Sequence, residues 1–188
     1  MIERNFAPLL ARSLAGDFSW YESGEDCIRF CNFVAAQALR TRGVKERTVG
    51  RLKERMGMDV SRIWDILALI YGFDIGCALF LARKKRRLIA VRNDTSVPFI
   101  TGDQPVVNLH GNRETPPEMA SLYYPISPRL ALYLGEPDEV PPEIPFEAMT
   151  ATGASYLNLR IAVASHAQVY ARTPDLLTAV QGSFDRTA

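Results

Sequence analysis

The stretch Phe99-Ile100-Thr101-Gly102-Asp103-Gln104-Pro105-Val106-Val107 decides how the second half of this chain is interpreted. A β-prone apolar run enters a tight turn of Gly, Asp and Pro, and a second apolar run leaves it. Asp103 is therefore expected on a short corner between two strands. A carboxylate there either accepts backbone hydrogen bonds and holds the turn, or is presented as a general base or metal ligand. The turn interpretation is favoured modestly, because Asp in turns commonly bonds the backbone.

Short β-prone segments bounded by turn residues surround this corner and predict an antiparallel meander. They are residues 88–91, 97–101, 106–109, 122–126 and 130–134. Beyond them the chain is expected to return to helix over 146–164, to add a strand at 168–171 and to end in a helix over 174–180.

The first half of the chain has helical periodicity. Residues 2–14 form one predicted helix, and 24–39 a second that begins with Ser23 as its N-cap. Gly43 is expected to end that region, and 44–56 predicts a polar surface helix. Three cysteines, an odd number in a chain of this length, do not suggest a disulfide framework. All three are predicted to be core residues rather than metal ligands.

An apolar segment over 66–82 has several features of a membrane span. It contains Gly72-x-x-x-Gly76 and is followed by the basic run 83–87. However, Asp74 would lie at its centre at a cost of about 3 kcal/mol, and the run is at the lower length limit for spanning. We therefore expect a buried core helix, with the cations placed at its C-terminal end where they suit the helix dipole. A phosphate-binding patch is the alternative role for these cations.

The predicted fold class is α+β, with a helical N-terminal half packed on a small, mainly antiparallel sheet and one or two C-terminal helices. Residues 1–188 are expected to form one domain, with a mainly helical subregion over 1–87 and the sheet and last helices over 88–188. The net charge of +1 gives no overall field that would favour nucleic acid or an anionic membrane. With no signal-peptide pattern, we expect a cytoplasmic location and no membrane insertion.

Three segments carry a resemblance to a known family. They are Gln37-Ala38-Leu39-Arg40-Thr41, Phe99 to Val106, and Tyr124-Pro125-Ile126-Ser127-Pro128-Arg129. In this order and spacing the chain resembles domain-of-unknown-function family 4238, whose members show Q-x-x-R-T, F-I-T-S-D-N-P-V and P-L-S-P-R segments. Gly102, Gln104 and Ile126 depart from that pattern. Members usually begin with an H-x-x-P-x-x-Y-L segment that this chain lacks, so a site that used its His is not expected to be intact here. The family implies no established activity.

Arg40 and Arg129 are the natural counter-charges for Asp103, and Gln37 and Thr101 would support them. Facing one another, these side chains would form either an ion-pair network that ties the helices to the sheet or a pocket for an anionic or phosphorylated ligand. The network is favoured modestly.

Two classes of function remain open. The first is a ligand-binding or protein-interaction module, which the absent N-terminal segment favours. The second is a hydrolase acting on a phosphate ester or nucleic acid, metal-dependent in one version, with Asp103 as metal ligand or base and the arginines on phosphate. No cofactor and no metal-ligand set is predicted, and no phosphate-loop, G-x-S-x-G or H-E-x-x-H pattern occurs in the sequence.

Overall fold

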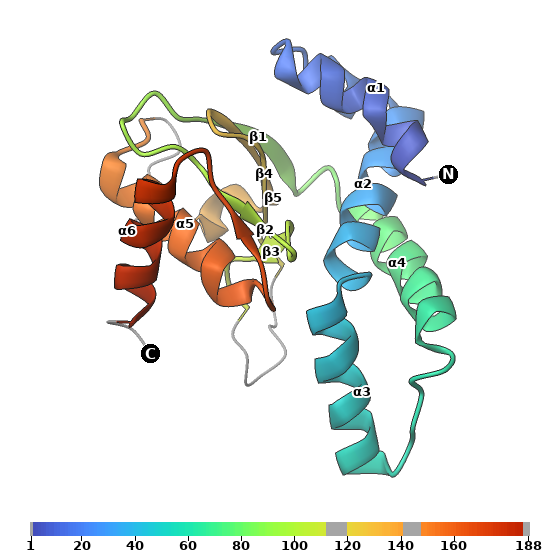
Figure 1. The fold of residues 1–188 in the computed structure, drawn as a ribbon. Coiled ribbons are helices and arrows are strands. Elements are labelled where there is room, and N and C mark those ends of the chain that lie inside the picture. Colours follow the sequence, from blue (N-terminus) through green and yellow to red (C-terminus); the bar gives the residue numbers. More distant parts are fainter. Residues whose placement is uncertain (1, 112–119, 141–147, 186–188) are drawn as a thin grey trace. The chain divides into compact units, whose positions relative to one another are not determined.

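The computed structural model describes residues 2–111, 120–140 and 148–185. The chain divides into two compact units, Met1–Arg83 and Lys84–Ala188, and each has its own core. The fold class is α+β, as predicted, with helices in the first unit and an antiparallel sheet and further helices in the second (Figure 1). The prediction that residues 1–188 form one domain stays a prediction.

The first unit is helical throughout. Its core joins Phe6 to Phe33, whose rings stack with centroids 3.8 Å apart, and to Phe30 and Trp20, whose ring centroids are 5.0 Å apart. Its elements are α1 (Ile2–Leu14), the short helix η1 (Ser19–Tyr21), α2 (Gly24–Leu39), α3 (Arg42–Met56) and α4 (Trp64–Leu81).

Hydroxyl caps fix where two of these helices begin. The Ser23 Oγ accepts from the Asp26 N–H at 3.4 Å, as the sequence predicts for α2. The Thr41 Oγ1 accepts from the Val44 N–H at 3.4 Å, which starts α3 at Arg42. The prediction that Gly43 ends the helical region is therefore wrong, because Gly43 lies buried inside the first turn of α3.

Small residues on α4 bring it close to α2 (Figure 1). A Cβ added at Gly76 would lie 2.1 Å from the Asn32 Oδ1 and 2.9 Å from the Asn32 Cα. The Gly72-x-x-x-Gly76 spacing therefore serves helix packing within this unit. By length and composition alone, α4 is long and apolar enough to cross a membrane. Within the structure, 28% of it is buried. The expectation of a buried core helix is thus right for the face on α2 and wrong for the opposite face.

The second unit contains two sheets. The larger has the strand order β1 (Arg87–Arg92), β5 (Leu130–Gly135), β4 (Leu122–Ser127) and β3 (Val107–Asn108), all antiparallel. The smaller pairs β2 (Thr101–Gly102) with β6 (Val169–Tyr170). The predicted strand 88–91 is present as β1, but it pairs with β5, out of chain order. The meander prediction is confirmed for β3, β4 and β5, which are neighbours in chain order. It is wrong for 97–101, where only Thr101 is in a strand, and that strand pairs with β6 instead of the larger sheet.

Helices α5 (Ala151–Ala164) and α6 (Pro174–Asp185) follow the sheet, after the short helix η2 (Pro137–Glu139). The Thr150 Oγ1 caps α5 by accepting from the Gly153 N–H at 3.0 Å, so the helix starts later than the predicted 146; residues 146 and 147 are outside the described part. Buried Asn158 holds α5 to the chain before β2, because its Oδ1 accepts from the Ile100 N–H at 3.0 Å and its Nδ2 donates to the Pro98 carbonyl at 2.9 Å.

Candidate functional site

Asp103 lies immediately after β2 and binds the connection between α5 and β6. Its Oδ1 accepts from the His166 N–H at 2.8 Å, and its Oδ2 accepts from the Ala167 and Gln168 N–H groups at 2.7 and 3.1 Å. Its own N–H donates to the Gln168 carbonyl at 3.0 Å. The carboxylate therefore continues the β2–β6 pairing beyond the strands and fixes the direction in which β6 leaves α5.

These bonds also set the acidity of Asp103. Partial burial raises the pKa of the carboxyl, but the N–H groups of His166, Ala167 and Gln168 outweigh it, so the pKa lies below the ordinary value of 3.8. A carboxylate stabilised in this way is a weaker base than a free one. Its geometry suits a positioning residue better than a general base.

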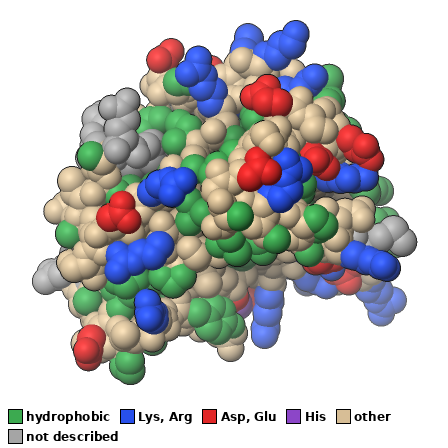
Figure 2. Space-filling view, turned by 90° about the horizontal axis from the view of Figure 1, so that it is seen from above, with side chains coloured by type: hydrophobic (Ala, Val, Ile, Leu, Met, Phe, Trp, Pro, Cys, Tyr) green, Lys and Arg blue, Asp and Glu red, His purple; other side chains and the backbone are tan. Residues whose placement is uncertain are grey.

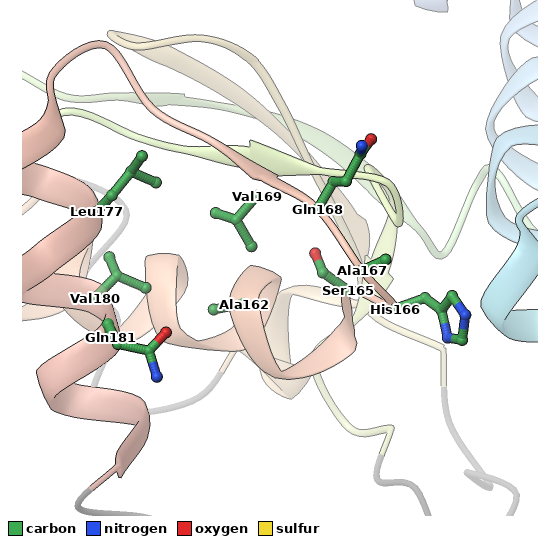
Figure 3. A pocket seen from close by; sticks show the side chains of 9 residues that line it. All are labelled: Ala162, Ser165, His166, Ala167, Gln168, Val169, Leu177, Val180 and Gln181. Atoms are coloured by element: carbon green, nitrogen blue, oxygen red, sulfur yellow. The ribbon is translucent and has the colours of Figure 1, made fainter.

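Strand β6 separates two hollows of the second unit, because side chains alternate across a strand. Val169 lines a pocket of about 400 Å³ between α5 and α6, and Tyr170 lines a groove of about 370 Å³ on the other side. In the α5–α6 pocket, Leu177 and Val180 project from α6 toward Val169, whereas the His166 ring points away from them (Figure 3). This pocket is lined mainly by apolar side chains with the amides of Gln168 and Gln181 at its edges.

The groove beside Tyr170 brings together three segments that are far apart in the sequence. We call it the motif groove, because two of the segments are those that carry the family resemblance. It is lined by Phe99, Ile100, Thr101, Pro125, Ile126, Ser127, Pro128, Tyr170, Ala171 and Arg172. Its volume lies within the range of small-molecule sites, and its wall is apolar except for Thr101, Ser127, the Tyr170 hydroxyl and the Arg172 guanidinium.

The predicted site residues of the second unit have separate places. Thr101 lines the motif groove and pairs with Tyr170 across the β2–β6 ladder. Arg129 donates through Nη1 to the Asn93 carbonyl at 3.2 Å and to the Thr95 carbonyl, so it braces the turn after β1. The Arg129 guanidinium thus binds backbone carbonyls, whereas the Asp103 carboxylate binds backbone N–H groups.

Gln37 and Arg40 belong to the first unit. Arg40 is the C-cap of α2, and its Nη1 forms an ion pair with the Glu3 Oε1 at 2.8 Å, which ties α2 to α1. Gln37 lies half-buried on the last turn of α2. The described partner of Arg40 is therefore a carboxylate of its own unit.

The remaining candidates for chemistry lie apart from both hollows. Cys27 and Cys31 are buried on α2, as predicted, but the prediction for Cys77 is wrong, because it is exposed on the outer face of α4. The His110 Nε2 lies 2.9 Å from the Ser121 Oγ. Among residues 2–111, 120–140 and 148–185, no three or more His, Cys, Asp and Glu residues are grouped closely enough to hold a metal ion.

Sequence reasoning missed Tyr170 and Arg172. Tyr170 ends the two-residue strand β6 and Arg172 lies two residues beyond it, and neither belongs to a motif quoted for the family. Their place opposite Phe99–Thr101 depends on the β2–β6 pairing, which joins residues nearly seventy positions apart.

Residues 1–175 match the family described as protein of unknown function (DUF4238). The chain belongs to the DUF4238 family. This confirms the resemblance drawn from the three sequence segments and assigns no activity. No curated protein and no solved structure matches this DUF4238 chain.

Proposed function

We propose that the second unit of this DUF4238 protein is a ligand-binding module whose site is the motif groove. The observation that carries this proposal is the convergence of Phe99–Thr101, Pro125–Pro128 and Tyr170–Arg172 around one apolar hollow of about 370 Å³. Pockets of this size with a few fixed polar groups are typical of small-molecule sites.

The polar groups at the groove suggest the class of ligand. Arg172 is the one cation among its lining residues, and it is exposed. A guanidinium binds carboxylates through two parallel hydrogen bonds. The groove therefore suits a ligand with an apolar body and a carboxylate end. This keeps the anionic ligand of the sequence prediction but assigns it to a cation that the sequence did not indicate.

The hydrolase hypothesis receives less support from the geometry. It needs Asp103 to present free carboxylate oxygens, whereas both oxygens accept backbone N–H bonds. Among the side chains shown in Figure 2, Lys and Arg are interspersed with Asp and Glu. A ligand-binding module is the proposal that these observations support best, and its cytoplasmic location stays a prediction.

Methyl-resolved NMR on the full chain tests the proposal, with octanoate as the probe. The Ile126 methyl lines the groove, whereas the Ile66 methyl lies on exposed α4, so the two report on different surfaces. We expect octanoate to shift the Ile126 signal and to leave the Ile66 signal in place. A titration that leaves Ile126 unchanged, or that shifts Ile66 equally, contradicts the proposal.

A further inference from the structure

The outer face of α4 is apolar and exposed. Ile66 is 62% exposed, Ile70 50% and Phe73 46%, and Leu81 at the end of the helix is 77% exposed. Surfaces of this kind are rarely left open on a monomer when they are continuous over more than a few hundred Å². The face lies opposite the stripe of Ala68, Gly72 and Gly76 that packs on α2, so α2 cannot cover it.

The spacing on this face is that of a coiled-coil seam. Successive seam residues are three, four, three, four and three positions apart, which is the a/d pattern of a heptad repeat. The pattern runs from the residue before α4 to its last turn. We call it the α4 seam; its members are Ile63, Ile66, Ile70, Phe73, Cys77 and Phe80.

We propose that the α4 seam packs against the α4 seam of a second copy of this chain, in an antiparallel pair with two-fold symmetry. A seam with this spacing needs a helix with the same spacing as its partner, and a second copy supplies one. The seam residues Ile63, Ile66, Ile70 and Phe73, with Leu69 and Leu81 beside them, are each between 43% and 77% exposed. Together they offer an apolar area on the order of the ~800 Å² per partner of a stable interface.

Charge decides the direction of the pair. The basic residues Arg83, Lys84 and Lys85 follow the C-terminal end of α4. A parallel pair would place the two basic clusters side by side, and like charges at one end oppose association. An antiparallel pair separates them by about 27 Å, the length of an 18-residue helix, which exceeds the Debye length at physiological salt.

The same face is less suited to a bilayer. Asp74 is exposed beside Ile70 and Cys77 on the flank of the seam, and a carboxylate in the hydrocarbon core is costly. In a helix pair, flanking positions remain in water. Asp74 is therefore compatible with a helix partner and opposes deep insertion into lipid.

Antiparallel a/d pairing fixes the register. Ile70 lies opposite the partner's Phe73, Ile66 opposite the partner's Cys77, and Ile63 opposite the partner's Phe80. The Phe80 ring is held in place by the Arg83 guanidinium, whose carbon lies 4.0 Å from the ring centroid. Each contact occurs twice, so the register predicts which residues can be linked between the two copies.

Sedimentation equilibrium of the full chain at about 50 µM measures the pairing, since this concentration detects micromolar association. We expect a dimer for the wild type and a monomer for Ile70→Lys. Tyr71→Lys is the matched control, because Tyr71 is 51% exposed on the same helix but lies outside the seam. Circular dichroism of each variant confirms that the helices are retained.

Disulfide formation tests the register itself. Ile66→Cys places a thiol opposite the partner's Cys77, whereas the two positions within one helix are about 16 Å apart and cannot be bridged. Mild oxidation should link two copies of Ile66→Cys. It should not link two copies of the double variant that carries both Ile66→Cys and Cys77→Ser. Cys27 and Cys31 are buried and should remain free.

Three results would each overturn the inference. One is a monomer at this concentration. Another is a wild-type dimer linked through Cys77 to the partner's Cys77, which requires a parallel pair. The third is a monomer that binds vesicles of phosphatidylcholine and phosphatidylserine, which assigns the seam to a membrane. Failure of this pairing would leave the octanoate experiment on the second unit unaffected.

Discussion

Replacing Asp103 is the change that best separates a positioning role from a catalytic one. In Asp103→Asn the amide nitrogen must replace one oxygen, so an N–H group faces a backbone N–H of residues 166–168. In Asp103→Ala all three bonds are lost. Asp94→Asn is the control, since Asp94 is an exposed carboxylate in the turn after β1.

The magnitude follows from the bonds. Hydrogen bonds to charged groups contribute about 1.5–3 kcal/mol each when buried, and water competes at the half-buried Asp103 carboxylate. We expect the free energy of unfolding to fall by about 1–2 kcal/mol in Asp103→Asn and by about 2–4 kcal/mol in Asp103→Ala. For a chain of this size, 1 kcal/mol lowers Tm by about 2–4 °C, so Asp103→Asn should melt about 2–8 °C lower.

The pH dependence carries a definite sign. The pKa of Asp103 is lower in the folded chain than its ordinary value of 3.8, so the stabilisation is present above that value and is lost as pH falls through the lower folded pKa. The stability difference between wild type and Asp103→Asn should therefore be constant near neutral pH and shrink below pH 3.8. Urea titrations at several pH values measure it.

Hydrogen exchange locates the effect. In Asp103→Asn the amides of Ala167, Gln168 and Tyr170 should exchange faster, whereas those of β5 should not change. An Asp103→Asn variant that is as stable as wild type at neutral pH, with unchanged exchange in this segment, would refute the positioning role. It would return Asp103 to the list of candidate bases.

Three further predictions concern packing and cooperativity. Gly102→Ala should lower the free energy of unfolding by about 1–3 kcal/mol, because its Cβ would lie 2.1 Å from the Ser165 Oγ, and Ser165→Ala should reduce that loss in a double-mutant cycle measured in urea. Gly76→Ala should lower the free energy of unfolding by a similar amount, because its Cβ would meet Asn32. Gly50→Ala should instead raise Tm, because Gly50 lies in α3 with open space around its Cβ. The expected gain in the free energy of unfolding is about 0.5–1 kcal/mol. The single-domain prediction expects one calorimetric unfolding transition for the full chain, and two separate transitions would contradict it.

The sequence predicts the start or end of a helix or strand where neighbouring residues alone determine it. The Ser23 cap places the start of α2, and the turn residues around 127–129 place the β4–β5 hairpin. Gly43 misleads, because the stronger signal is the Thr41 hydroxyl two residues earlier. The α+β class follows from these local signals together.

Long-range pairing limits what the sequence can predict about the site. The partners of Asp103 are 63 to 65 positions away, and no spacing rule connects a turn Asp with a helix end at that separation. The same holds for Arg172, which enters the motif groove only because β6 pairs with β2. The composition of α4 does not predict that one of its sides is exposed, since an apolar helix can have the same sequence whether or not another element packs on that side.

Two probes with opposite charges test most directly whether Arg172 makes the motif groove selective for a carboxylate. Octanoate and octylammonium are each titrated into the protein, and the Ile126 methyl signal gives the dissociation constants. The titrations are made with wild type, Arg172→Gln and the control Arg92→Gln. Arg92 is an exposed residue at the end of β1. We expect octanoate to bind more tightly than octylammonium, and Arg172→Gln alone to abolish this preference. The substitution should weaken octanoate binding by about tenfold, the loss of one charge-assisted contact. Equal affinities for the two probes, or a preference that survives Arg172→Gln, would contradict it.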